Sequence, residues 1–193
     1  MKFLAFLLVL VPLASAAVKK CPEDWREFNR DSGRWCIHVF GGDINRHQAQ
    51  ARCEALGATL SGVQNAEEKH YIHTEGVSVL RAQGMKYGSL WLGMLRKNDC
   101  RGGNAKNAAC KGSSGFYWSD GATSNKNMMT WDGHNPDNNG GNQNCVHMYL
   151  VDGVSGPNGV RPGNLDDIQC ESSNNGRNSL QSIRAYVCGK RPV

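Results

Sequence analysis

The sequence predicts an α+β domain that is held together by disulfide bonds. All eight cysteines follow an N-terminal leader, which is the first observation. Two segments in the first half have the apolar spacing of amphipathic helices, and short apolar or aromatic runs typical of strands recur along the chain. After the leader about 177 residues remain, which is enough for one compact domain with a substantial core.

The leader, residues 1–16, has the features of a secretory signal peptide. Lys2 gives it a positive start, residues 3–13 are apolar, and Ala14-Ser15-Ala16 is a small-residue cleavage site. The apolar run is too short to span a bilayer. We therefore expect cleavage after Ala16, a single domain over residues 17–193, and a secreted, extracellular protein without a membrane span.

The cysteines favour disulfide bonds over metal binding. They stand at positions 21, 36, 53, 100, 110, 145, 170 and 188. An even number of cysteines in an exported chain is typical of a disulfide framework, and the paired Cys-x-x-Cys clusters of a zinc site are absent from the sequence. Eight cysteines allow 105 pairings, so their spacing alone selects none of them.

The charge of the chain gives little support to a nucleic-acid or membrane-surface partner. There are 22 basic residues, of which Lys2 lies in the leader, against 17 acidic residues. The basic residues are spread along the sequence and form no polybasic block.

The first half predicts a hairpin and two helices. Aromatic residues flank a turn at residues 31–33, which indicates a hairpin between Cys21 and Cys36 that continues as strand over residues 37–40. We expect Asn45 to cap a helix that ends near Leu56, before Gly57. Residues 59–63 are expected to form a short extended segment.

Asn65 is expected to cap the second helix, with Glu68 three residues later, as in a capping box. This helix reaches Thr74 or extends as far as Ala82. His70 and His73 lie on it, and we interpret them as helix surface rather than a metal pair, because the sequence suggests no third ligand.

The second half predicts strands at residues 90–94, 116–118, 146–151 and 186–188. The segment from Cys100 to Cys110 contains several small residues, and we interpret it as a surface excursion joined to itself.

Two polar segments, residues 131–145 and 164–170, each end in a cysteine. If Cys145 and Cys170 are joined, the segments approach one another, and one hard cation could be surrounded by Asn135, Asp137, Gln143, Asp166 and Asp167. Ca²⁺ takes six to eight oxygen ligands and tolerates irregular geometry. The sequence therefore predicts a Ca²⁺ site in these loops.

Several motifs in this order resemble those of a C-type lectin-like domain over nearly all of residues 21–188. Residues 90–94 read Leu-Trp-Leu-Gly-Met and resemble the family's Trp-Ile-Gly-Leu motif, and residues 116–121 read Phe-Tyr-Trp-Ser-Asp-Gly. Asn135-Pro136-Asp137 stands where the family carries Glu-Pro-Asn or Gln-Pro-Asp. Leu165-Asp166-Asp167 stands at the Trp-Asn-Asp motif.

The resemblance implies a long-form C-type lectin-like fold, in which two helices flank small antiparallel sheets beside a long calcium-binding loop region. It also implies the pairs Cys21–Cys36, Cys53–Cys188 and Cys145–Cys170, which leave Cys100–Cys110. Gln143 replaces a frequent Glu and Asp166 replaces the usual Asn, so the number of carboxylates around the ion is kept.

The function that the resemblance implies is calcium-dependent carbohydrate binding, with sugar contacts from Asn135, Asp137, Gln143 and Asp166. The amide of Asn135 precedes the acid of Asp137, as in Gln-Pro-Asp, so galactose-type glycans are favoured over mannose-type ones. Glycan or pathogen recognition is the expected role, and the sequence leaves the oligomeric state open.

The sequence also bears on two other function classes. A metal-independent protein- or surface-binding module on the same fold remains open. An enzyme is not expected, because the sequence contains neither a nucleophile elbow nor a His-Glu-x-x-His motif. We interpret His134 as a loop residue and His147 as half-buried core.

Overall fold

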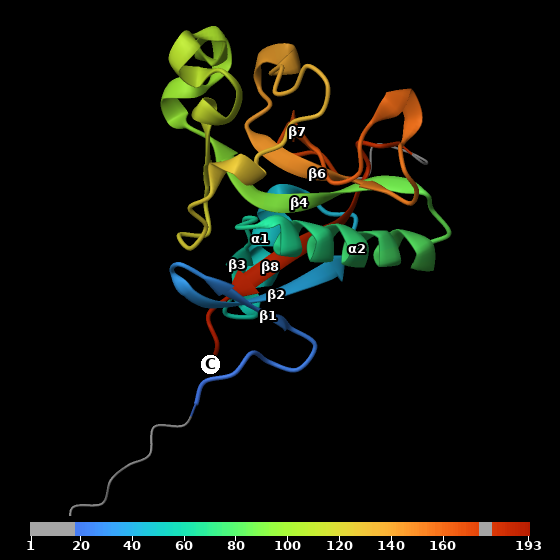
Figure 1. Cartoon of the computed structure of the whole chain (residues 1–193). Helices are drawn as coiled ribbons and strands as arrows, with labels where there is room; N and C mark the ends of the chain where they lie inside the picture. The colour runs from blue at the N-terminus through green and yellow to red at the C-terminus, as the bar shows by residue number, and fades with distance from the viewer. Residues whose placement is uncertain (1–17, 174–178) are drawn as a thin grey trace, which may run out of the picture.

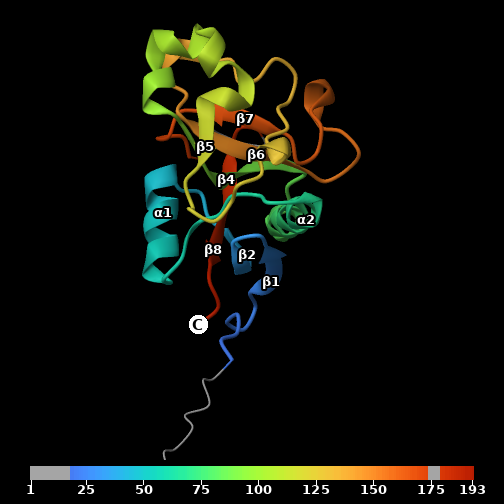
Figure 2. The same cartoon turned by 60° about the vertical axis from the view of Figure 1, so that its left-hand side comes forward.

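The computed structural model describes residues 18–173 and 179–193, and the predicted leader lies outside that part. The strands and the two α-helices follow in the order β1 Arg26–Arg30, β2 Gly33–Gly41, α1 Arg46–Ala55, β3 Thr59–Leu60, α2 Ala66–Ala82, β4 Tyr87–Arg96, β5 Phe116–Trp118, β6 Cys145–Val151, β7 Leu165–Ile168 and β8 Ile183–Lys190. Helices α1 and α2 lie on opposite sides of the sheet (Figure 2).

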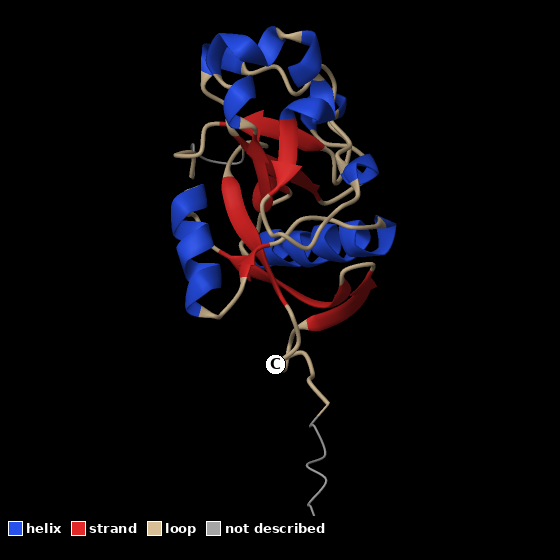
Figure 3. Ribbon diagram, turned by 90° about the vertical axis from the view of Figure 1, so that its left-hand side faces the viewer, coloured by secondary structure: helices blue, strands red, loops and turns tan. Residues whose placement is uncertain are grey.

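The strands form a single sheet rather than the separate small sheets expected from the sequence. Its order is β1-β2-β8-β4-β6-β7, with β3 also paired to β8 and β5 to β4. Pairing is antiparallel except between β4 and β8, which run parallel. The helical half contains β1, β2, β3 and both helices, and the loop half lies beyond β4 (Figures 1 and 3).

The helix caps follow the sequence prediction, with one difference. Asn45 caps α1 in a full capping box with Gln48, and Gly57 follows the helix with φ +64°. Asn65 accepts a hydrogen bond from the backbone N–H of Glu68, as expected. The Glu68 carboxylate does not return to the cap, because it accepts from Arg30 and from the backbone N–H of Gln64 instead.

The core is centred on β4. Trp91 is fully buried and its indole N–H donates to the carbonyl of Ile44 at 2.9 Å. Gly93 is required where β4 passes the chain at Leu60, because a Cβ there would lie 2.0 Å from the Leu60 carbonyl oxygen. The packing therefore explains the glycine in the Leu-Trp-Leu-Gly-Met run.

The three disulfide pairs implied by the resemblance, Cys21–Cys36, Cys53–Cys188 and Cys145–Cys170, are present, and so is the remaining pair Cys100–Cys110. Lys20 and Val193 exchange two backbone hydrogen bonds of 3.0 Å, so the two ends of the domain lie together (Figure 1). In the described part of the chain, no helix is long and apolar enough to cross a membrane.

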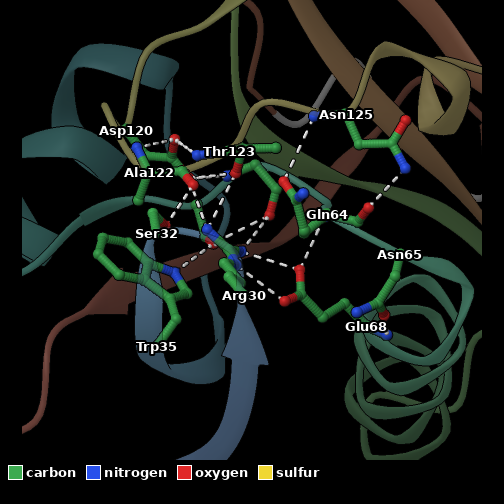
Figure 4. Close-up of polar contacts among 12 residues, drawn as sticks. Arg30, Ser32, Trp35, Gln64, Asn65, Glu68, Asp120, Ala122, Thr123 and Asn125 are labelled. Carbon is green, nitrogen blue, oxygen red and sulfur yellow. Dashed lines mark hydrogen bonds and ion pairs between the residues drawn. The ribbon is translucent and has the colours of Figure 1, made fainter.

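A buried polar cluster around Arg30 joins the helical half to the turn that follows β5 (Figure 4). The guanidinium donates to both carboxylate oxygens of Glu68 on α2 at 2.8 Å, and it lies 3.3 Å from the carboxylate of Asp120. It also donates to Thr123 Oγ1 and stands over the ring of Trp35. The side chains of Arg30, Glu68 and Asp120 are fully buried.

Arg30→Met is expected to lower the free energy of unfolding by about 3–5 kcal/mol, because two buried carboxylates lose their counter-ion. Arg34→Met is the matched control, since Arg34 pairs with Glu27 at the exposed surface and should cost less than about 1 kcal/mol. Urea unfolding with the disulfides intact measures both. Equal losses in the two variants would contradict a special role for Arg30.

His73 is half-buried rather than exposed helix surface, and its Nε2 accepts a hydrogen bond from the backbone N–H of Val151 at 3.4 Å. Burial, followed by the nearby charges of His70 and Lys69, lowers the pKa of His73 below its ordinary value of 6.5. The neutral imidazole is therefore the form that the fold favours.

This shift predicts that stability is lost as the pH falls below 6.5, because the unfolded chain takes up the proton more readily than native His73 does. The imidazole signal of His73, identified by its loss in His73→Gln, should titrate with a midpoint below 6.5 by NMR. A midpoint at or above that value would contradict the burial argument.

Candidate functional site

The candidate site is the polar loop at residues 132–144 in the loop half, together with β7 beneath it. The Asn135–Pro136 peptide bond is cis. Asp167 on β7 is fully buried, and its carboxylate accepts one hydrogen bond from the backbone N–H of Asp137 and one from that of Asn138, each 2.9 Å long. Asp167 therefore fastens the backbone of the loop to the sheet.

Arg96, the last residue of β4, provides the positive charge for Asp167. Its Nη2 forms a short ion pair with Asp167, and its Nε donates to the carbonyl of Gln143 at 2.9 Å. The guanidinium also stands over the ring of Phe116 at 4.4 Å. Burial raises the pKa of the Asp167 carboxyl, while Arg96 and the two backbone N–H groups act against that shift.

Asp166 belongs to a different environment. Consecutive residues of a strand point to opposite faces of the sheet. The Asp166 carboxylate accepts a short hydrogen bond from the Tyr149 hydroxyl and lies 3.6 Å from Nε2 of His147. Burial, followed by the charge of Asp166, raises the pKa of Tyr149. Asp166 is only 5% exposed, and among the described residues its carboxylate accepts no hydrogen bond from the loop.

His147 is fully buried rather than half-buried, and its Nδ1 forms a short hydrogen bond with the hydroxyl of Ser89. Ser89, His147 and Asp166 thus lie in a row across the neighbouring strands β4, β6 and β7. Ser89 is itself fully buried and donates to the carbonyl of Leu180, so it is not placed to meet a substrate.

The remaining predicted residues lie on the loop. Asn135 is half-buried, and Asp137 is exposed with one carboxylate oxygen accepting from the backbone N–H of Asn139. The side-chain oxygen of Gln143 is buried without a hydrogen-bond partner among the described residues, as is that of Asn144. The structure therefore brings Asn135, Asp137, Gln143 and Asp167 to one region and leaves Asp166 outside it.

This donor set, as arranged, does not fit the predicted Ca²⁺ site. Ca²⁺ requires six to eight oxygen ligands, with carboxylates prominent among them. Of the three predicted carboxylates, Asp166 is bound elsewhere and Asp167 is neutralised by Arg96. Within residues 18–173 and 179–193, no group of three or more His, Cys, Asp or Glu side chains is placed to hold a metal. Calcium binding stays a prediction from sequence resemblance.

Arg96 is the site residue that the sequence analysis missed. It lies two residues beyond the apolar run at residues 90–94, where the predicted strand ends. Continuing the two-residue alternation of the strand beyond Met94 places Arg96 on the same inward face as Met94, and both are buried. A charged residue at an inward position requires a buried partner, which was the available signal.

The sequence model of the C-type lectin domain-containing protein 141/158 family matches residues 21–191. C-type lectin domain-containing protein 158 of Caenorhabditis elegans is 26% identical over 108 residues, which are 51% of this chain and 51% of that protein. The chain spans about half, or less, of the length of the curated relatives it matches.

Solved structures share the fold at low sequence identity. The cow carbohydrate-recognition domain of CD23, crystallised in the presence of a GlcNAc2Man3 oligosaccharide, is 19% identical with a TM-score of 0.56, covering 91% of this chain and 99% of that one. A calcium-independent type II antifreeze protein is 20% identical with a TM-score of 0.55, covering 93% and 100%. These likenesses show the fold, and the family model that matches residues 21–191 shows that the chain belongs to the C-type lectin domain family 141/158.

Proposed function

We propose that this protein is a secreted carbohydrate-binding protein whose ligand lies against the loop around cis-Pro136. The observation that carries the proposal is the fastening of the loop by Asp167. Because the backbone N–H groups of Asp137 and Asn138 are bound to Asp167, the loop is fixed while the Asp137 side chain remains at the surface.

The polar side chains of the loop can form hydrogen bonds with a sugar. The amide of Asn135 offers both donors and an acceptor, and the carboxylate of Asp137 offers acceptors, so together they match two neighbouring hydroxyl groups. The buried side-chain oxygen of Gln143, in the same region, has no hydrogen-bond partner among the residues that the structure describes. Asp166, predicted as a sugar contact, has no part in the proposal because it is bound to Tyr149 beneath the sheet.

Family membership supports the proposal, since the domain is lectin-like and its family is not one of enzymes in general. The order of amide before acid at positions 135 and 137 favours galactose-type over mannose-type glycans. The site is shallow and polar, so we expect weak binding of single sugars.

The geometry also favours a site that works without calcium. Sequence resemblance predicts Ca²⁺ beside Asp167, but the Arg96 guanidinium already supplies positive charge to that carboxylate. Were an ion to bind, Asn135, Asp137, Gln143 and Asp167 would be its available ligands, and Arg96 would have to leave Asp167. We therefore propose that sugar binding does not require the ion.

Asn135→Ala is expected to weaken galactose binding, because it removes the amide that pairs with a sugar hydroxyl. Asn29→Ala is the control, since Asn29 is exposed on β1 in the helical half. Isothermal titration or retention on immobilised galactose and mannose, with Ca²⁺ and with chelator, measures the effect. We expect the binding of the unaltered protein to persist in chelator. Equal affinity of both variants for every sugar would contradict the site, and would favour a protein- or surface-binding module.

Arg96→Met is expected to lower stability by about 3–5 kcal/mol, because Asp167 loses its buried counter-ion. Millimolar Ca²⁺ should leave the Tm of the unaltered protein unchanged and raise that of Arg96→Met, since an ion that binds only the native state stabilises it. Calorimetry with and without chelator tests this, with Arg34→Met as a variant that should not respond. If the unaltered protein itself gains Tm with calcium, the calcium site predicted from the sequence is supported instead.

A further inference from the structure

A pocket of about 230 Å³ lies between two segments that are distant in the sequence. One wall comes from the 3₁₀ turns that connect β4 to β5, and the other from the cis-proline loop. Figures 1 and 3 show these turns at the loop half, beside the candidate site. We call it the basic pocket, and the lining residues used below are Arg96, Lys106, Lys111, Pro136, Asp137 and Asn138.

Both walls of the basic pocket are fixed by bonds within the protein. The Cys100–Cys110 disulfide closes the 3₁₀ turns on themselves. The side-chain amide of Asn138 donates to the carbonyl of Gly102 at 3.0 Å and so joins the cis-proline loop to the turns. A ligand would meet a preformed pocket, which reduces the entropy that binding costs.

The charge of the pocket is mainly positive. Three of its lining side chains are cationic and one, Asp137, is acidic. Lys106 and Lys111 are exposed, and their ammonium groups have no hydrogen-bond or ion-pair partner within the described part of the chain. The connection from residue 97 to residue 111 carries four basic residues, Lys97, Arg101, Lys106 and Lys111, against the single acid Asp99.

Arg96 gives this pocket a buried anchor. Two of its guanidinium nitrogens are used, Nε by the Gln143 carbonyl and Nη2 by Asp167, and no hydrogen bond from Nη1 is found in the described part of the chain. A guanidinium held in one orientation can donate directed hydrogen bonds to the oxygens of a carboxylate or a sulfate. The ammonium groups of the lysines attract the same anion without requiring a particular orientation.

We propose that the basic pocket binds the acidic group of a glycan, a sulfate or a carboxylate, whose sugar ring lies against the cis-proline loop. The inference rests on the proposed function and adds the ligand class, because Asp137 belongs to the loop and also lines the pocket. Asp137 opposes an anion nearby, so the acidic group is directed toward Lys106, Lys111 and Arg96. A neutral sugar would use the loop alone.

The test compares matched glycans that differ in one acidic group: lactose, sialylated lactose and lactose sulfated on galactose. Their affinities are measured by isothermal titration for the unaltered protein, for Lys106→Gln with Lys111→Gln, and for the control Lys19→Gln with Lys86→Gln. The control removes the same charge from two exposed lysines that do not line the pocket.

We expect the acidic glycans to bind more tightly than lactose, and the preference to fall about tenfold in the pocket variant while the control keeps it. Lactose affinity should be the same in all three proteins. The sulfated and sialylated arms distinguish the two acidic groups, and the preference should weaken as salt screens the lysines.

Three outcomes overturn the proposal in distinguishable ways. Lactose binding without any preference for the acidic glycans contradicts the basic pocket and leaves the proposed function intact. An equal loss in the control variant shows attraction by overall charge rather than by the pocket. If none of the three glycans binds, both the pocket and the proposed carbohydrate function are wrong.

Discussion

The helical half of the molecule depends on one buried guanidinium, that of Arg30. It lies between a carboxylate on α2 and a carboxylate in the turn after β5, and it stands over the Trp35 ring of β2. Neither Glu68 nor Asp120 can be buried as an ion without this partner, since desolvated charges are tolerated only when they are paired and hydrogen-bonded. The position of α2 against the first hairpin is therefore coupled to the turn at residues 120–123.

The loop half repeats this arrangement with Arg96 and Asp167, but here the pair also determines the chemistry of the surface. Asp167 uses its two oxygens to hold backbone N–H groups of the cis-proline loop, and Arg96 compensates its charge from within the chain. The loop is thus fixed from below by a carboxylate that would otherwise require a bound cation. The same guanidinium lines the basic pocket, so a single side chain both supports the loop and belongs to the proposed ligand site.

Local patterns were enough to predict much of the fold. The Asn45 and Asn65 caps, the strands predicted at residues 116–118 and 146–151, and the excursion closed by Cys100 and Cys110 all follow from spacing and residue type over a few positions. The pairing of the other cysteines required the resemblance to a known family. Partners distant in the sequence could not be predicted: Glu68 fits a capping box locally, yet its carboxylate lies with Arg30, 38 positions away. The sequence predicts Asp166 and Asp167 in the same ion site. In the structure, the two side chains on β7 contact different partners, Tyr149 and Arg96.

The two ends of the described domain meet through the backbone bonds between Lys20 and Val193, and this has a practical consequence for how the protein can be presented. These ends lie at the helical half, away from the loops (Figure 1). A fusion partner or surface attachment at either end would leave the loop half pointing outward. Several copies joined through either end could then engage a glycan-coated surface together, and weak individual contacts would be strengthened by their high effective concentration.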